Sequence, residues 1–277
     1  MSQAVANPKF HHPSHKLQQI SQMGRGYRRQ LWVVAYVNQV GNSPLLDEAF
    51  ADIENSFEGG AEGADVVVLI NEWSSLGELE STLEGVRRRF PDIPLGINYL
   101  GDTEEPYGFK DSFRLARTYN LQIVWTDFSG VDLIQEREPV NLHEIQTLRP
   151  ENVFYASGIH MKYSTLRHAE KTIEESALQA MGWVDGVIVT GPKTGIPCDP
   201  VIALRARRVM HDYPLGVASG VNSENVHQIK DIVDFFLVAS SLQDEAKRIS
   251  AQKVKTLRLA LGNELYKAQY KKDLPLL

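Results

Sequence analysis

Two short segments near the end of the chain carry residue types that bind phosphate. Ser219-Gly220-Val221 leads from an apolar run into a glycine turn, and Ala239-Ser240-Ser241 follows the last apolar run. Gly220 lets backbone N–H groups approach an anion because it has no Cβ, and the serine hydroxyls add donors. Two capped turns, with Asn222 or Ser223 as N-cap, would use the same residues without a ligand. We predict that the two segments together bind one phosphate group.

A third polar segment, Thr190-Gly191-Pro192-Lys193-Thr194-Gly195, follows the sixth apolar run. Its glycines, threonines and lysine could form a loop in which Thr190, Gly191 and Lys193 close over the same anion. The Gly-Lys-Ser/Thr order of a Walker A loop is absent, which argues against a nucleotide-binding P-loop. An ordinary surface loop with an exposed lysine is the alternative.

Ionisable side chains after earlier apolar runs are candidates for proton transfer. If the strand pleat continues past the fifth run, His160 and Lys162 share one face. A lysine there could hold phosphate, polarise a carbonyl or form a Schiff base, and a histidine could transfer protons near neutral pH. Glu72 and Asp127 suit a general base, or a magnesium ion held mainly through the ligand's phosphate. A hydrogen-bonded histidine and a solvated lysine would need no catalytic role.

The elements that must position these residues recur at a regular interval. Eight short apolar or β-branched runs begin 20 to 33 residues apart, which matches repeated strand–helix units. Several are apolar without alternation, as expected of parallel strands covered on both faces. The runs lie at 31–37, 64–70, 93–98, 121–126, 153–159, 186–190, 215–218 and 235–239. We predict a (β/α)₈ barrel of the phosphate-binding type, with an open doubly wound sheet as the structural alternative.

A barrel brings the residues that follow its strands to one common mouth, where binding and catalysis occur. Three amides are predicted there beside the ionisable groups: Asn38, Asn71 and Asn98. The eight units fill the chain, so we expect a single domain over 1–277, with 1–30 as an N-terminal extension and 129–150 as a loop insertion after the fourth strand. Between the last two strands only a short helical segment around 224–229 has room to form, and the tail over 242–270 is also helical in pattern.

Composition limits the partners and the cellular location. The chain of 277 residues is 43% hydrophobic and 23% charged, with a net charge of −6, which argues against broad nucleic-acid binding. A single cysteine, Cys198, forms no internal disulfide and indicates a reducing, cytoplasmic location. No run approaches the roughly 20 apolar residues of a membrane span. Arg25, Arg28 and Arg29 could touch anionic lipid, although a solvated charge run explains them as well. The sequence leaves a homo-oligomer open.

The chain also resembles a known family, the BtpA-like barrel proteins, named for a photosystem I biogenesis factor. The resemblance is carried by Val187-Ile188-Val189-Thr190-Gly191-Pro192-Lys193-Thr194-Gly195 and Ser219-Gly220-Val221-Asn222-Ser223-Glu224-Asn225-Val226. It extends to Gly41-Asn42-Ser43-Pro44, Gly63-Ala64-Asp65 and Pro94-Leu95-Gly96-Ile97-Asn98. This resemblance implies a barrel over most of the chain.

Departures from the family pattern fall at the mouth. Asn38 stands where the resemblance implies a histidine, and Asn71-Glu72-Trp73-Ser74 replaces a stretch like Asn-Phe-Gly-Asp. Lys162-Tyr163 replaces Lys-His, and Leu242-Gln243 lies where a lysine is implied. Two functions are therefore open. The first is an enzyme acting on a sugar phosphate or phosphoribosyl compound as an isomerase, lyase or transferase; the second is a non-catalytic assembly or regulatory factor that keeps the barrel.

Overall fold

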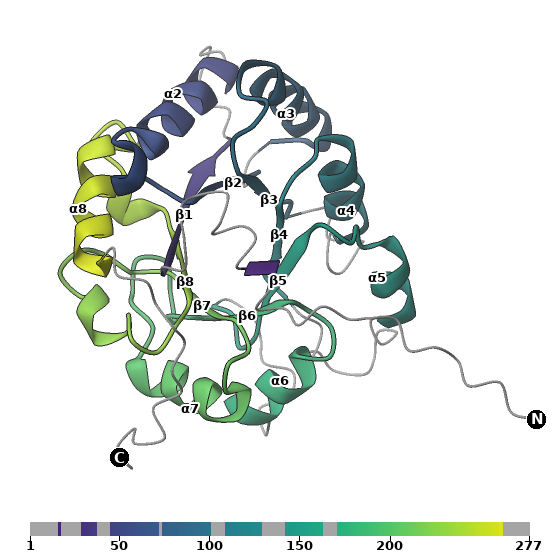
Figure 1. Ribbon diagram of the computed structural model, residues 1–277, viewed down its shortest axis with the longest axis vertical. Helices are drawn as coiled ribbons and strands as arrows, with labels where there is room; N and C mark the ends of the chain where they lie inside the picture. Colours follow the sequence, from purple (N-terminus) through teal and green to yellow (C-terminus); the bar gives the residue numbers. More distant parts are fainter. Residues whose placement is uncertain are drawn as a thin grey trace, which may run out of the picture.

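Eight parallel strands close into a barrel in which each strand pairs with the next along the chain and β8 pairs with β1 (Figure 1). The computed structural model describes residues 16–17, 29–37, 45–71, 74–100, 109–128, 142–162 and 171–262. The pairing of β1 with β8 confirms the predicted (β/α)₈ barrel and excludes the open sheet. The strands are β1 (Gln30–Tyr36), β2 (Val66–Ile70), β3 (Leu95–Asn98), β4 (Ile123–Thr126), β5 (Phe154–Gly158), β6 (Gly186–Thr190), β7 (Leu215–Ala218) and β8 (Phe235–Val238).

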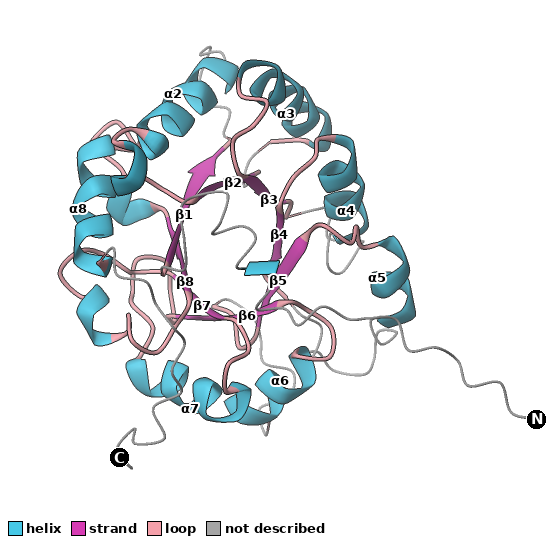
Figure 2. Ribbon diagram, viewed as in Figure 1, coloured by secondary structure: helices cyan, strands magenta, loops and turns pink. Residues whose placement is uncertain are grey.

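Helices surround the strand ring on its outer side (Figure 2). Short-range signals set where they begin: Ser75 with Glu78 and Thr172 with Glu175 form capping boxes, and Asp199 caps the helix whose first residue is a proline. The helices are α2 (Leu45–Phe57), α3 (Leu76–Arg89), α4 (Phe109–Thr118), α5 (Leu142–Leu148), α6 (Ile173–Ala180), α7 (Pro200–Met210) and α8 (Ala251–Leu261), with the 3₁₀ turns η1 (Gly60–Glu62), η2 (Val226–Gln228) and η3 (Ser240–Leu242). No helix in the described part of the chain is long and apolar enough to cross a bilayer.

Two segments differ from the sequence-based expectation. The second half of the predicted insertion, 129–150, is helix α5, which contacts α4 and buries Ile145 in the outer core. Residues 129–141 lie outside the described residues, so the insertion and the N-terminal extension stay predictions. The C-terminal helix begins at Ala251 rather than near 242, because Gln243 and Ile249 form an antiparallel bridge and Ser250 caps the helix.

Aromatic rings fill the amino-terminal half of the barrel interior. The rings of Trp32 and Phe235 stack with centroids 4.4 Å apart, and Phe154 meets Trp32 edge-on at 5.8 Å. A Cβ on Gly216 would lie 2.1 Å from the Phe235 ring, so glycine is required for this ring to fit. The backbone carbonyl of Leu17 accepts a hydrogen bond from Gln30 Nε2 at 2.9 Å at the same end. Inside the barrel, space for a ligand is therefore left towards the carboxyl ends of the strands.

Four polar side chains recur at the amino ends of the even-numbered strands. Each stands immediately before its strand and accepts a hydrogen bond of 2.7–2.9 Å from a backbone N–H near the start of the preceding odd-numbered strand. The acceptors are Asp65, Gln122, Asp185 and Asp234, and their donors are the N–H groups of Leu31, Leu95, Tyr155 and Leu215. The barrel therefore repeats one arrangement every two strands.

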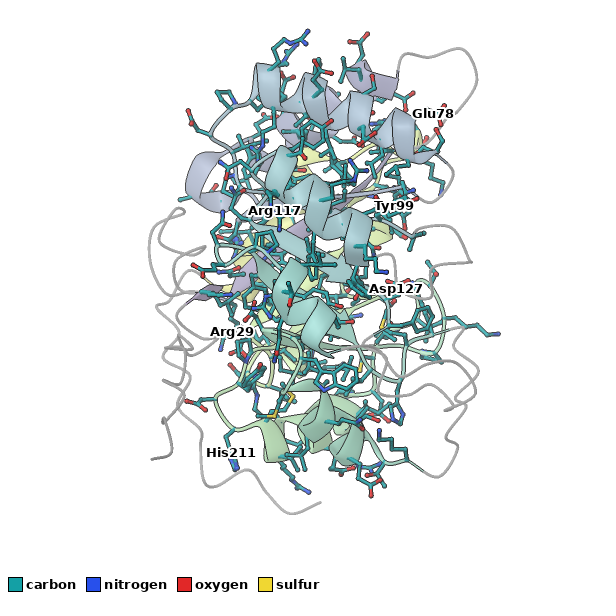
Figure 3. All side chains as sticks on the ribbon, turned by 90° about the vertical axis from the view of Figure 1, so that its right-hand side faces the viewer. Arg29, Glu78, Tyr99, Arg117, Asp127 and His211 are labelled. Carbon is teal, nitrogen blue, oxygen red and sulfur yellow. The ribbon has the colours of Figure 1, made fainter. Side chains whose placement is uncertain are left out.

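An arginine binds each of these acceptors from the helix that precedes the odd-numbered strand in the ring. These strand-entry arginines are Arg258 of α8, Arg87 of α3, Arg149 directly after α5, and Arg207 of α7. Three of the arginines also donate to a backbone carbonyl just before the odd-numbered strand. Arg258 donates to Arg29 O, Arg87 to Ile93 O and Arg207 to Tyr213 O. Gln122 is the one neutral acceptor of the four, and its Oε1 lies 3.3 Å from Arg87 Nη2, the longest of these arginine–acceptor distances. Figure 3 places Arg29 and His211 at this end and Asp127 and Tyr99 at the opposite end.

The segment after β8 is fixed to helix α2 by a buried carboxylate. Asp52 is 3% exposed and accepts hydrogen bonds from Ile249 N at 2.9 Å and Arg248 Nη2 at 2.5 Å. Arg248 also pairs with Glu48. Burial raises the pKa of Asp52 to about 6, and the Ile249 N–H and the Arg248 charge oppose this shift. Because Ser250 N bonds to Leu242 O, this anchor also holds the end of η3.

Replacing Arg258 by methionine tests the strand-entry arginines. Both Arg258 and its partner Asp65 are buried, with side-chain exposures of 0% and 2%. Loss of one member of a buried pair leaves an uncompensated charge, so we expect the free energy of unfolding to fall by about 3–5 kcal/mol. The matched control is Arg88→Met, because Arg88 and Glu84 are 77% and 64% exposed; we expect less than about 1 kcal/mol there. Equal effects in urea denaturation would contradict this account.

The raised pKa of Asp52 predicts a pH dependence of stability. Its folded-state pKa of about 6 lies above the ordinary value of 3.8, so the folded chain binds the proton more tightly than the unfolded chain. Protonation of Asp52 therefore increases the free energy of unfolding as the pH falls through 6, and this contribution is lost as the pH rises through 6. Between pH 7 and 5, wild type should gain about 1 kcal/mol relative to Asp52→Asn, measured by denaturation at each pH. A difference that is constant or of opposite sign would refute the assignment.

Candidate functional site

A cavity of about 500 Å³ opens at the carboxyl ends of the strands. This size is typical of pockets for small organic ligands. Its lining comes from strands β1, β2, β4, β7 and β8 and from the segments that follow β3 to β8. The lining residues are Val34, Tyr36, Ile70, Leu100, Trp125, Asp127, Met161, Lys162, Thr194, Gly195, Ala218, Ser219, Gly220, Val221, Asn222, Leu237, Val238, Ala239, Ser240 and Ser241.

The turn after β7 is held in an unusual backbone conformation. Ser219 and Gly220 have φ values of 72° and 65°, in the left-handed region that is costly for a serine. Thr190 Oγ1 donates to Ser219 Oγ at 2.9 Å, and Asn225 Nδ2 donates to the Gly220 carbonyl at 2.8 Å. Asn222 caps the following turn by accepting from Asn225 N at 2.9 Å. The capped turn considered from the sequence is thus present, and it lines the cavity.

The turn after β8 lies directly beside the turn after β7. Ser241 Oγ donates to Val221 O at 2.5 Å, which joins the two turns. The first hydrogen bond of η3 runs from Leu242 N to Ala239 O. The N–H groups of Ser240 and Ser241 come before it in the chain and so are not used by the hydrogen bonds of this turn. Ser240 is exposed and Ser241 is half-buried. The two segments predicted to bind one phosphate therefore form one wall of the cavity.

The loop after β6 is packed onto the β7 turn. A Cβ on Gly191 would lie 1.9 Å from Ile196 O, and one on Gly220 would lie 2.2 Å from Pro197 N, so both positions need glycine. Thr194 and Gly195 of this loop line the cavity, whereas Lys193 is exposed and is absent from the lining. Lysine and threonine were neighbours in the predicted loop, and the sequence pattern could not show which one faces inward.

The fifth strand does not continue as predicted. It ends at Gly158, and His160 has a φ of 46°, which breaks the pleat and separates the two side chains. Lys162 lines the cavity and donates from Nζ to Thr194 Oγ1 at 3.1 Å. His160 Nε2 instead lies 2.9 Å from Ser176 Oγ of α6, outside the cavity lining. The interpretation that His160 and Lys162 share one face is therefore wrong.

Asp127 is the described carboxylate that lines the cavity. It accepts a hydrogen bond from Asn98 Nδ2 at 3.1 Å, and Asn98 is fully buried, with no partner for its Oδ1 among the described residues. Asn71 has a different role: it accepts from Leu100 N at 2.8 Å and donates to Ser74 O at 3.1 Å, which fixes the backbone after β2 and β3. The predicted mouth residues Asn38 and Glu72 lie outside the described residues.

Metal binding has limited support in the part of the chain that the structure describes. There, no group of three or more histidine, cysteine or acidic side chains comes together. Magnesium held mainly through a ligand's phosphate stays a prediction. Burial raises the pKa of Cys198 to about 12, so this thiol is neutral and unreactive at ordinary pH.

Solved structures of low sequence identity share this fold. Thiamine phosphate pyrophosphorylase from Pyrococcus furiosus aligns with a TM-score of 0.55 and 14% identity over 84% of this chain and 95% of that one. Phosphoribosyl anthranilate isomerase from Thermus thermophilus gives 0.53 and 13%, over 84% and 98%. Tryptophan synthase from Mycobacterium tuberculosis gives 0.59 and 14%, over 90% and 96%. At these identities the similarity shows the barrel fold alone.

Two curated archaeal proteins, both uncharacterized, match part of the sequence. One from Pyrococcus horikoshii is 28% identical over 163 residues, covering 57% of this chain and 60% of that protein. One from Methanocaldococcus jannaschii is 27% identical over 164 residues, covering 56% and 59%. The chain thus spans about three fifths of the length of these relatives. The BtpA family model matches residues 89–261, more than half of the chain, which confirms the resemblance. The chain belongs to the BtpA family.

Proposed function

We propose that this barrel is an enzyme whose cavity holds the phosphate group of a small phosphorylated molecule between the turns after β7 and β8. One observation carries the proposal: the hydrogen bond from Ser241 to Val221 brings two hydroxyl-rich turns together at one wall of the cavity. Backbone N–H groups of such turns, together with serine hydroxyls, form concavities that favour anions. The loops after the last two strands of (β/α)₈ barrels frequently form phosphate sites.

Two groups beyond the turns suit chemistry on such a ligand. Lys162 brings a positive charge to the cavity and can neutralise the phosphate or polarise a carbonyl. Asp127, oriented by Asn98, can accept a proton from the bound molecule. Isomerase, lyase or transferase chemistry on a phosphorylated molecule fits these groups. Two solved structures of similar fold are named for phosphorylated compounds, thiamine phosphate and phosphoribosyl anthranilate, which supports the ligand class by analogy.

A charge placed at the proposed phosphate site tests its location. Ser240 lines the cavity and is exposed, so Ser240→Glu should fold while its carboxylate repels a bound phosphate. We expect wild type to be stabilised by millimolar phosphate in thermal unfolding at constant ionic strength, and the variant to need at least about 10-fold more phosphate for the same shift. The control is Gln228→Glu, which adds the same charge at an exposed position of η2 outside the cavity lining.

The outcomes of this experiment separate the site from general charge effects. Gln228→Glu should keep the phosphate dependence of wild type. If neither phosphate nor any phosphate monoester stabilises wild type, the proposed function is wrong. A Ser240→Glu variant that responds to phosphate as wild type does would place the anion elsewhere.

A further inference from the structure

One wall of the cavity is polar and the rest of its described lining is mainly apolar. The two regions therefore suit chemically different parts of one ligand. Ser219 to Asn222 and Ala239 to Ser241 supply the polar wall. Away from it, the side chains of the described lining carry polar groups at five positions: Tyr36, Trp125, Asp127, Lys162 and Thr194. A cavity of about 500 Å³ is far larger than a phosphate ion, so the organic part of the ligand must occupy the remaining space.

The rest of the described lining is mostly apolar. Five of its side chains come from strands and belong to the apolar cluster inside the barrel: Val34, Ile70, Trp125, Ala218 and Leu237. A sugar phosphate carries several hydroxyl groups, and each one placed against such a wall gives up its hydrogen bonds to water without replacement. A flat, unsaturated ring loses little on entering the same space, because its faces form no hydrogen bonds to water. The described walls therefore favour a ring over a polyol.

Trp125 and Met161 make the wall suited to a ring. Both line the cavity, and both belong to the apolar cluster inside the barrel. An indole packs against another aromatic ring by offset or edge-on contact, and a thioether sulfur makes favourable contacts with ring edges. Trp125 is 7% exposed, and its Nε1 has no hydrogen-bond partner among the described residues.

We infer that the ligand is a phosphate ester whose organic part is a flat, unsaturated ring, and that Trp125 determines this specificity. This inference rests on the proposed phosphate site and narrows the ligand from the sugar phosphates considered from the sequence. Bound in this way, the ester would place its phosphate on the turns after β7 and β8 and its ring against Trp125, with Asp127 and Lys162 beside the ring.

Four simple probes separate the two parts of the ligand: inorganic phosphate, ribose 5-phosphate, cyclohexyl phosphate and phenyl phosphate. Their dissociation constants for the full chain can be measured by calorimetry at constant ionic strength. We expect phenyl phosphate to bind at least 10-fold more tightly than ribose 5-phosphate and several-fold more tightly than cyclohexyl phosphate, which has the same number of carbons but a puckered ring. The comparison with cyclohexyl phosphate needs no variant.

Substitutions then assign the selectivity to a residue. Trp125→Leu should lower the affinity for phenyl phosphate about 10-fold and change that for inorganic phosphate less than twofold. Trp125→Phe, which keeps a flat ring in the wall, should retain most of the preference. Trp183→Leu is the matched control, because Trp183 is half-buried outside the cavity lining; it should leave all four affinities unchanged.

Each outcome is decisive for one of the two proposals. Phenyl phosphate binding no more tightly than ribose 5-phosphate or cyclohexyl phosphate would overturn the inference and leave the phosphate site intact. A preference that survives in Trp125→Leu would overturn the role of Trp125. If none of the four probes binds wild type, the proposed function itself fails, and the inference fails with it.

Discussion

The rest of the barrel depends on the strand-entry arginines, of which Arg207 and Arg258 are buried and Arg87 and Arg149 half-buried. Each strand-entry arginine joins a helix to the acceptor that stands before an even-numbered strand, and that acceptor also binds the backbone of the preceding strand. One side chain thereby fixes a helix and two strands at once. Because this occurs four times around the ring, the amino end is determined by charge-assisted hydrogen bonds as well as by apolar packing.

Rigidity at one end leaves the other end free to carry function. The rings of Trp32, Phe154 and Phe235 fill the amino-terminal half of the barrel interior, so the cavity is confined to the carboxyl ends of the strands. There the backbone departs from regular geometry, most clearly at Ser219, where a left-handed serine is held by neighbouring hydrogen bonds. Strain of this kind persists where surrounding structure enforces it, and it is often found at binding sites. Asp52 of α2 accepts a hydrogen bond from Ile249 N and so fixes the segment after η3 to this helix.

The strand positions could be predicted because parallel strands buried on both faces are continuously apolar, as in β2 and β6. Once the strands were placed, the barrel rule put the turns at Ser219 and Ser240 together. Contacts that depend on side-chain direction could not be predicted. The positive φ of His160 breaks the strand pleat, so its side chain does not share the cavity face with Lys162. In the loop after β6, Thr194 lines the cavity and Lys193 does not. The long-range pair of Arg258 and Asp65 leaves no local pattern, and Trp125 has the same sequence signature as a core residue.

Electron density from crystals equilibrated with phosphate would show directly whether the two turns bind one anion. We expect an anion in the cavity, within hydrogen-bonding distance of backbone N–H groups or hydroxyls from both the turn after β7 and the turn after β8. Its oxygens should replace water at Ser219 or Gly220 and at Ser240 or Ser241. A cavity that holds water alone at saturating phosphate, or an anion bound away from these two turns, would contradict the account.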